Sequence, residues 1–204
     1  MKNNFILHTM TLGMAIGLLV SCSQSTSHEV QKATLLSKEP VPFSQEQVLR
    51  GEYMVTVMGC NDCHSPKVFG PEGPTPDPER LLSGHPQDMP LPKIDTTLIG
   101  PWVLFNPHNT ATVGPWGVSF AANLTSDPTG IGNWTEEQFT RALREGKSKG
   151  LANNRNILPP MPWSMFSKLT DEDLTSIFAY LKSIKPVRNV PPPPMALKDI
   201  SIEQ

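Results

Sequence analysis

Apolar residues recur at helical spacing near the C-terminus of the chain. From Leu174 to Ile184 they follow one another three or four residues apart, which forms one stripe that can face a core. Thr170 precedes this stripe and is followed by three acidic residues, a typical helix N-terminus. The pattern predicts a helix that opens at Thr170 and runs through Lys182, before Pro186 stops it.

Two more segments carry the same kind of start signal. Ser44-Gln45-Glu46-Gln47 has the form of a capping box, and apolar residues follow it, so we expect a first helix from about Gln45 to Met58. Thr135 with Gln138 opens a segment that runs through Arg144, and Gly146 supplies its end. Three helices are therefore predicted in the part of the chain that starts at Ser44.

The long segment between the first two helices has a different composition. The chain holds 22 Pro and 14 Gly but only 2 Tyr, so much of it is expected to be irregular loop. Two short strands are predicted at Leu98–Phe105 and Val113–Ala121, joined as an antiparallel hairpin by the turn formers of Asn106–Asn109. The tail from Val190, with its four prolines, is expected to be extended and then frayed.

The N-terminus has the pattern of an export signal. Lys2 precedes the apolar stretch Phe5–Val20, which is too short and too polar to predict a membrane span. Leu19-Val20-Ser21-Cys22 resembles the lipobox of bacterial lipoproteins, in which the cysteine receives lipid and becomes the first residue. An ordinary secretory signal with a chance cysteine at Cys22 is the alternative, and both interpretations predict export to the periplasm or cell envelope.

Charge and composition exclude one class of partner and suggest how the chain is organised into segments. Its 17 Lys and Arg against 19 Asp and Glu give a formal net charge of −2, and no basic run points to nucleic acid. We expect a signal peptide at residues 1–21, a tether at 22–43 that holds the protein to a membrane by lipid on Cys22, one domain at 44–186 with an insertion at about 65–120, and a Pro-rich tail at 187–204.

The chemistry is concentrated in Cys60-Asn61-Asp62-Cys63-His64, a C-x-x-C-H pattern. Two thiols one helical turn apart can reach the two vinyl groups of one haem, and the adjacent imidazole of His64 can face its iron. Such attachment takes place outside the cytoplasm, in agreement with the export signal. A single motif predicts one covalent haem c on Cys60 and Cys63, which favours electron transfer over haem catalysis.

Zinc binding and thiol redox chemistry compete with this interpretation. Zinc would need two more ligands, and only a scattered pair such as His85 and His108 is at hand. A thioredoxin-like site would need a βαβ frame around the cysteines, which the pattern lacks. His28, His85 and His108 lie in polar or loop stretches and are expected to be solvated surface residues rather than ligands.

The sixth ligand of the iron separates two functions. A methionine or histidine closes the iron and makes an electron carrier, whereas an open position would make a sensor or a haem enzyme. Met161 is the best candidate, because the prolines on both sides stiffen the loop that would present its thioether. The alternative is that Met161 simply fills core space, as methionine often does. Its rivals are Met54, Met58, Met89, Met165, His85 and His108.

From about Ser44 to Lys185 the chain resembles the haem-binding domain of bacterial periplasmic c-type cytochromes, in the cytochrome c superfamily. The matching pieces occur in that family's order: Arg50-Gly51-Glu52-Tyr53, the C-x-x-C-H motif, Ala122-Asn123-Leu124-Thr125, Gly130-Ile131-Gly132-Asn133-Trp134-Thr135, Pro160-Met161-Pro162-Trp163 and Leu169-Thr170-Asp171-Glu172-Asp173-Leu174. The departure from the family is the long Pro-rich segment between His64 and Met161.

The resemblance implies a mainly α fold in which the first and last helices cross near the haem, with Gly51 permitting their close approach. It also implies His64 and Met161 as axial ligands, and an electron carrier rather than an enzyme. Its redox partners would be a dehydrogenase, a respiratory complex or an oxidase.

Further residues have a possible place around the haem and a more ordinary structural one. Trp102, Trp116 and Trp134 are candidate donors to the haem propionates, although buried tryptophans are more often plain core. Phe120, Asn123 and Thr125 could likewise line a haem pocket, but a turn before Asp127-Pro128 also explains them, so they are not counted among the site residues.

Overall fold

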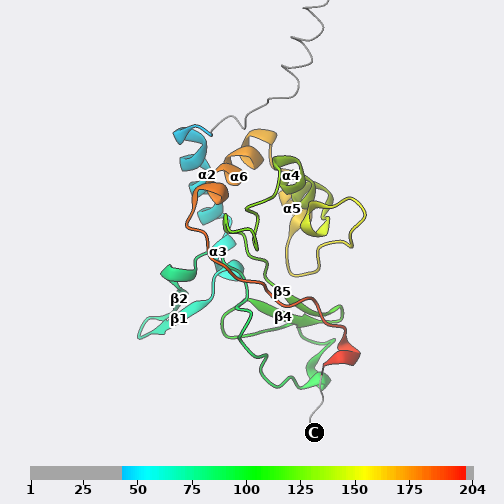
Figure 1. The fold of residues 1–204 in the computed structure, drawn as a ribbon. Coiled ribbons are helices and arrows are strands. Elements are labelled where there is room, and N and C mark those ends of the chain that lie inside the picture. Colours follow the sequence, from blue (N-terminus) through cyan, green and yellow to red (C-terminus); the bar gives the residue numbers. More distant parts are fainter. Residues whose placement is uncertain (1–42, 201–204) are drawn as a thin grey trace, which may run out of the picture. The chain divides into compact units, whose positions relative to one another are not determined.

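A computed structural model describes residues 43–200 (Figure 1). Residues 1–42, which include the predicted export signal, Cys22, His28 and the tether, lie outside the described residues, as do residues 201–204. The fold is mainly α with small antiparallel sheets, as the sequence predicted.

All three predicted helix starts form capping boxes. Helix α2 (Gln45–Val57) begins after Ser44, whose hydroxyl accepts the Gln47 N–H at 3.2 Å while the Gln47 side chain accepts the Ser44 N–H at 2.9 Å. Helices α4 (Glu136–Glu145) and α6 (Asp171–Ser183) begin with the same reciprocal pair of bonds. The helix boundaries lie within one or two residues of those predicted.

Helices α2 and α6 lie side by side and cross at Gly51 (Figure 1). A Cβ at Gly51 would overlap the backbone carbonyl of Ser176 and stand 2.8 Å from the Cβ of Tyr180. The absence of a side chain therefore lets the two backbones touch, which confirms the predicted role of this glycine. Next to the crossing, Arg50 forms an ion pair with Asp173 at 2.5 Å.

The core of the helical region is the apolar stripe of α6. Phe178 is 4% exposed and its ring lies 5.3 Å from that of Phe139 on α4, centroid to centroid, whereas Tyr180 is only partly buried. The buried members of this cluster come from α2, α4, α6 and two loop positions: Val55, Leu82, Ile131, Phe139, Leu143, Leu174, Ile177, Phe178 and Leu181. The helices therefore close on one another around α6.

The predicted hairpin exists, but its strands are shorter than expected and it forms a three-stranded sheet. Strand β3 (Leu104–Phe105) pairs antiparallel with β4 (Ala111–Gly114), which pairs in turn with β5 (Gly117–Phe120). The predicted strand Leu98–Phe105 was wrong over most of its length, since Leu98 ends a short 3-10 helix. The predicted strand Val113–Ala121 is split, because Pro115 and Trp116 turn the chain between Gly114 and Gly117.

A second hairpin was not predicted. Strands β1 (Lys67–Gly70) and β2 (Gly73–Pro76) pair antiparallel directly after the C-x-x-C-H motif. Two of the four residues of β2 are prolines, which lack the N–H that a central strand needs, so the sequence argued against a strand there. The pair tolerates them because it is an isolated two-stranded ribbon.

The C-terminal segment also differs from its prediction. Instead of fraying after the prolines, it lies along β5, where Val118 and Met195 exchange backbone hydrogen bonds of 2.8 and 3.1 Å (Figure 1). Ile200 is 7% exposed and packs with Val113 and Val118 in a small second core. The outer edge of β5 and this apolar cluster hold the segment in place.

None of the described helices is long and apolar enough to span a bilayer.

Candidate functional site

The C-x-x-C-H motif forms a short helix of its own, α3 (Cys60–His64). It starts immediately after α2 because Gly59 takes a left-handed conformation, with φ at 70°, and turns the chain. Cys60 and Cys63 are both partly buried, and neither is in a disulfide. The two thiols are therefore three residues apart on one helix, unpaired and next to His64.

Burial keeps both cysteines as neutral thiols. Loss of solvent raises the pKa of Cys60 to about 11, and it raises the pKa of Cys63 as well, with the Asp62 charge adding to the effect. The Asn109 amide lies 3.8 Å from the Cys63 sulfur. Reactive redox cysteines have lowered pKa values, so the setting differs from a thioredoxin-like site. Within residues 43–200 no three His, Cys, Asp or Glu side chains are grouped to hold a metal ion.

The orientation of His64 is fixed by one hydrogen bond. Its Nδ1 lies 2.8 Å from the backbone oxygen of Ala122, and a carbonyl can only accept, so Nδ1 carries the proton. Burial lowers the pKa of His64, which keeps the imidazole neutral. The lone pair of Nε2 is therefore free, as a metal-ligating histidine requires.

A lysine that the sequence analysis did not single out closes the motif helix. Lys67 is buried, and its Nζ donates to the carbonyls of Asn61, Asp62 and Ser65 at 3.2, 2.8 and 2.5 Å. A cation at a helix C-terminus satisfies the last carbonyl groups and opposes the helix dipole. The sequence signal that could have identified Lys67 was its position three residues after His64.

The chain after the motif is tied back to it. The Ser65 hydroxyl donates to the Asn61 side chain and accepts the Leu82 N–H, both at 2.8 Å, and Gly84 N–H donates to the His64 carbonyl at 2.7 Å. These bonds join α3 to residues about 20 positions further on, so the insertion supports the motif helix directly.

Met161 lies just before α5 (Trp163–Phe166), in a loop held at both ends. The Ser119 hydroxyl donates to the Pro159 carbonyl at 2.7 Å, and the Met161 carbonyl accepts the Trp163 N–H at 2.9 Å. Met161 and Cys60 are both partly buried and pack against the same apolar cluster. The structure therefore brings Met161 and the motif helix to one core.

The rival methionines occupy different settings. Met165 is 71% exposed, so its thioether points toward solvent. The sulfur of Met89 lies 3.8 Å from the Asn106 amide, which uses it as an acceptor. Met54 and Met58 both pack from α2 and its end against the helical core, as methionine commonly does.

The expectation that His85 is a solvated surface residue was wrong. Its side chain is fully buried, with Nδ1 2.9 Å from the Thr110 hydroxyl and the ring centroid 4.9 Å from that of Phe120. Its position next to a proline suggested an exposed loop, but Thr110, just before β4, and Phe120, on β5, pack against it. His108 is partly buried, and its Nδ1 accepts the Lys67 backbone N–H at 3.1 Å.

The other aromatic and polar candidates have structural contacts. Trp102 is 66% exposed, so it is neither core nor a buried donor, while Trp116 donates from Nε1 to the Ser119 hydroxyl at 3.3 Å and Trp134 packs against the helical core. Asn123 is buried and donates to the Val187 carbonyl at 2.8 Å, which ties this segment to the C-terminal one. Asn123 also accepts from Thr125 at 2.8 Å.

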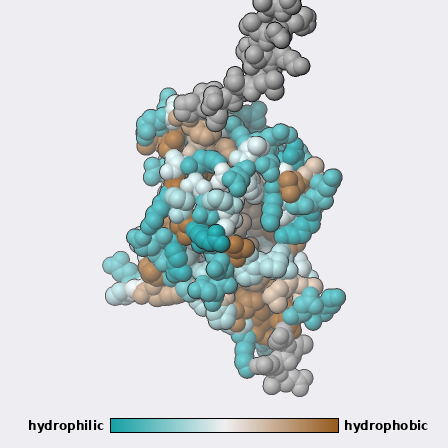
Figure 2. All heavy atoms as spheres, in the orientation of Figure 1, coloured by the Kyte–Doolittle hydropathy of each residue, from teal (hydrophilic) through white to brown (hydrophobic). Residues whose placement is uncertain are grey.

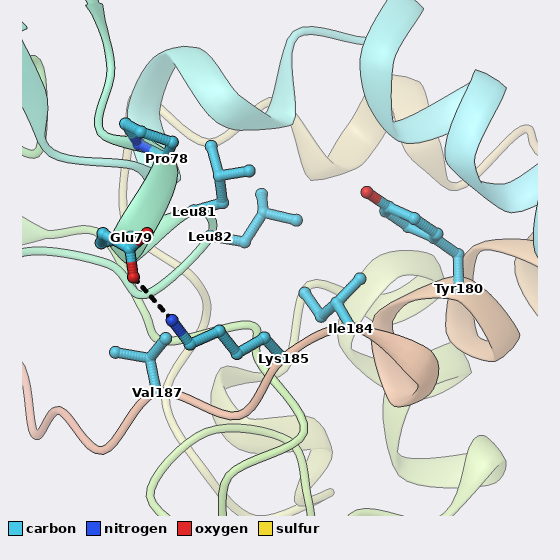
Figure 3. Close-up of a pocket in the computed structure, with 8 residues that line it drawn as sticks. All are labelled: Pro78, Glu79, Leu81, Leu82, Tyr180, Ile184, Lys185 and Val187. Atoms are coloured by element: carbon cyan, nitrogen blue, oxygen red, sulfur yellow. Dashed lines mark hydrogen bonds and ion pairs between the residues drawn. The ribbon is translucent and has the colours of Figure 1, made fainter.

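A small cavity lies between the end of α6 and the loop that precedes Leu82 (Figure 3). Tyr180 and Ile184 line one side, and the ion pair of Lys185 with Glu79 at 2.7 Å closes another (Figure 3). Its volume is about 80 Å³, well below the roughly 300 Å³ at which ligand pockets begin. No motif cysteine lines it, so it is separate from the candidate site.

Comparison with known proteins supports a class for this chain. No family model matches it. Its curated relatives include cytochrome subunits of dehydrogenases, which supports a cytochrome c family and an electron-transfer role. By their names these relatives are electron-carrying subunits rather than catalytic ones.

Three of these relatives illustrate the range. The fructose dehydrogenase cytochrome subunit of Gluconobacter japonicus is 31% identical over 153 residues, which is 73% of this chain and 24% of the relative. The gluconate 2-dehydrogenase cytochrome c subunit of Pantoea cypripedii is 29% identical over 76% of this chain and 26% of the relative. The cytochrome c subunit of the quinone-dependent alcohol dehydrogenase of Gluconobacter oxydans is 40% identical over 75 residues, 36% of this chain and 15% of the relative. The chain thus spans about a quarter or less of their length.

Proposed function

We propose that this protein is a single-haem electron carrier. Cys60 and Cys63 would hold one haem c through thioether bonds, and His64 and Met161 would be the axial ligands of its iron. The observation that carries the proposal is the hydrogen bond from His64 Nδ1–H to Ala122, because it leaves a neutral Nε2 beside two unpaired thiols.

The residues present fit this group. Thioether formation consumes the thiol protons, and both cysteines are held as neutral thiols without a disulfide between them. The apolar cluster that contacts Cys60 and Met161 suits a large hydrophobic ring system. Lys67 and Gly84 brace the carbonyl end of α3, so the imidazole would be presented from a fixed helix.

When bound, the haem supplies an iron that changes between Fe(III) and Fe(II) as it takes up and releases one electron. The residues of the chain itself would hold the haem and its ligands in position. The Ala122 carbonyl orients His64, the buried apolar side chains keep water away, and the thioether of Met161 would close the remaining position. With both positions filled by protein, no substrate binds and the chain acts as a carrier.

We further propose a dehydrogenase as the redox partner and the cell envelope as the location. The names of the curated relatives support the partner, although the chain spans only part of each relative. The export pattern before Cys22, and its likeness to a lipobox, support a lipid anchor in a membrane facing the periplasm.

Mass spectrometry of the denatured protein, produced with a haem-attachment system, tests the cofactor. The wild type is expected to gain the mass of one haem, while the double variant Cys60→Ser/Cys63→Ser gains none. Cys22→Ser is the matched control, since it is expected to keep the haem and lose only the lipid. A wild-type protein without added haem mass would refute the proposed function.

A further inference from the structure

A cationic loop leads from α4 toward Met161. Between Glu145 and Asp171 the sequence has no acidic residue, while the loop at residues 147–156 holds Lys147, Lys149 and Arg155. The chain as a whole is slightly acidic, with 17 Lys and Arg against 19 Asp and Glu. Positive charge is therefore concentrated on this loop, which extends beyond α4 and α5 in yellow (Figure 1).

These charges are not neutralised within the described residues. The Lys147 ammonium donates to the Asn156 side chain at 3.2 Å and the Arg155 guanidinium donates to the Asn156 carbonyl at 2.8 Å, so both bind neutral groups. Lys149 is exposed and in no ion pair with a described carboxylate. The nearby helix arginines differ, because Arg141 pairs with Glu137 and Arg144 with Asp171.

The loop is braced against the element that presents Met161. The two ends of the loop are joined by hydrogen bonds from Ser148 N–H to the Arg155 carbonyl at 3.0 Å and from Ile157 N–H to the Gly146 carbonyl at 2.6 Å. At its base, a Cβ on Gly146 would stand 2.8 Å from the Cε3 atom of Trp163, so this ring lies flat on the glycine. Trp163 follows Met161 by two residues, and the cationic loop therefore borders the Met161 loop.

We propose that the cationic loop is the docking surface for an acidic face of the protein that exchanges electrons with this chain. The inference rests on the proposed function and specifies the chemistry of its partner. Lys149 and Arg155 are exposed, and these cations without a carboxylate partner among the described residues attract a negatively charged surface, raise the rate of encounter and orient it toward the redox centre. Because these charges are exposed, salt screens their effect.

Small redox reagents of opposite charge measure this local field without a known partner. For the reduced, haem-loaded double variant Lys149→Glu/Arg155→Glu, oxidation by anionic hexacyanoferrate(III) at low salt is expected to be about tenfold slower than for the wild type. Oxidation by cationic tris(phenanthroline)cobalt(III) is expected to become several-fold faster. Both differences should shrink at about 0.5 M salt, where the Debye length is only a few ångströms.

The control is Arg188→Glu/Lys198→Glu, which reverses two exposed cations in the C-terminal segment and changes the net charge equally. Equal rate changes in both double variants would overturn the inference and leave the carrier function standing. As a second readout, paramagnetic hexacyanochromate(III) is expected to broaden the amide signals of residues 147–156 in the wild type more than those of the C-terminal segment. Uniform broadening would contradict the proposal, and a chain without covalent haem would refute the carrier function itself.

Discussion

Two regions of this domain are held together in different ways. In the helical region each helix begins with its own capping box, and the helices then meet over the apolar stripe of α6. In the loop-rich region, buried amides connect segments that are far apart in sequence. Asn189 alone donates to the carbonyls of Ser83 and His85, which precede it by more than 100 residues.

The two regions differ in whether the residues that stabilise them are close together or far apart in the sequence. A capping box involves residues three positions apart, so it is visible in the sequence as a local pattern. A buried asparagine that satisfies distant carbonyl groups has no local pattern, because its partners are defined only by the fold. The space-filling view shows polar and apolar residues interspersed over the visible face of the described domain (Figure 2).

The largest effect is expected at the crossing of α2 and α6. In an ordinary helix Gly→Ala gains up to about 1 kcal/mol, but a Cβ at residue 51 overlaps the Ser176 backbone, so Gly51→Ala is expected to lose about 2 to 3 kcal/mol. Denaturant unfolding measures this loss. Thr56→Ala, at an exposed position of the same helix, is the control and is expected to change stability by less than about 0.5 kcal/mol. A stabilised Gly51→Ala variant would mean that the helices do not touch there.

The loop-rich region is tested next by Asn189→Ala. The substitution leaves the buried carbonyls of Ser83 and His85 without the Asn189 donor and removes the acceptor of the Gln87 N–H. The free energy of unfolding is therefore expected to fall by about 2 kcal/mol. The same unfolding experiment on Asn153→Ala, at an exposed loop position, should give almost no change. If both variants lost equally little, buried amides would not hold this region together.

The smallest effect is expected from the ion pair beside the crossing. The Arg50 guanidinium lowers the pKa of Asp173 by hydrogen bonding and charge. A lowered folded pKa gives stability that is complete above the ordinary aspartate pKa of about 3.9 and is lost as pH falls through the lower folded value. The stability difference between wild type and Asp173→Asn should therefore be greater at pH 7 than at pH 3. A pH-independent difference would contradict this origin, and Asp88→Asn, at an exposed position, controls for the loss of one carboxylate.

The sequence predicted the helical region better than the insertion. The starts of α2, α4 and α6, and the contact at Gly51, depend on local pattern or on a single missing side chain, and they were predicted correctly. The burial of His85 and the docking of Met195 on β5 were missed, because each depends on a partner strand formed elsewhere in the chain.

In the candidate site, too, some features are visible as a local sequence pattern and others depend on distant residues. The spacing of Cys60, Cys63 and His64 is itself the local pattern, so the sequence was sufficient to propose it. Their supports are non-local or unmarked: the Ala122 carbonyl that orients His64 is 58 residues away, and a backbone acceptor carries no residue-type signal. Lys67 was close enough in sequence to notice, but its burial could not be predicted from its type.

The carrier function is tested most directly by the absorption spectrum of the haem-loaded protein, oxidised and reduced, in the wild type, Met161→Ala and Met165→Ala. We expect a low-spin, six-coordinate iron that does not bind carbon monoxide. The weak long-wavelength band of methionine ligation should be present in the wild type and in Met165→Ala and be lost in Met161→Ala. A five-coordinate wild-type spectrum that responds to carbon monoxide and is unchanged by Met161→Ala would contradict the carrier function and indicate a haem sensor or enzyme.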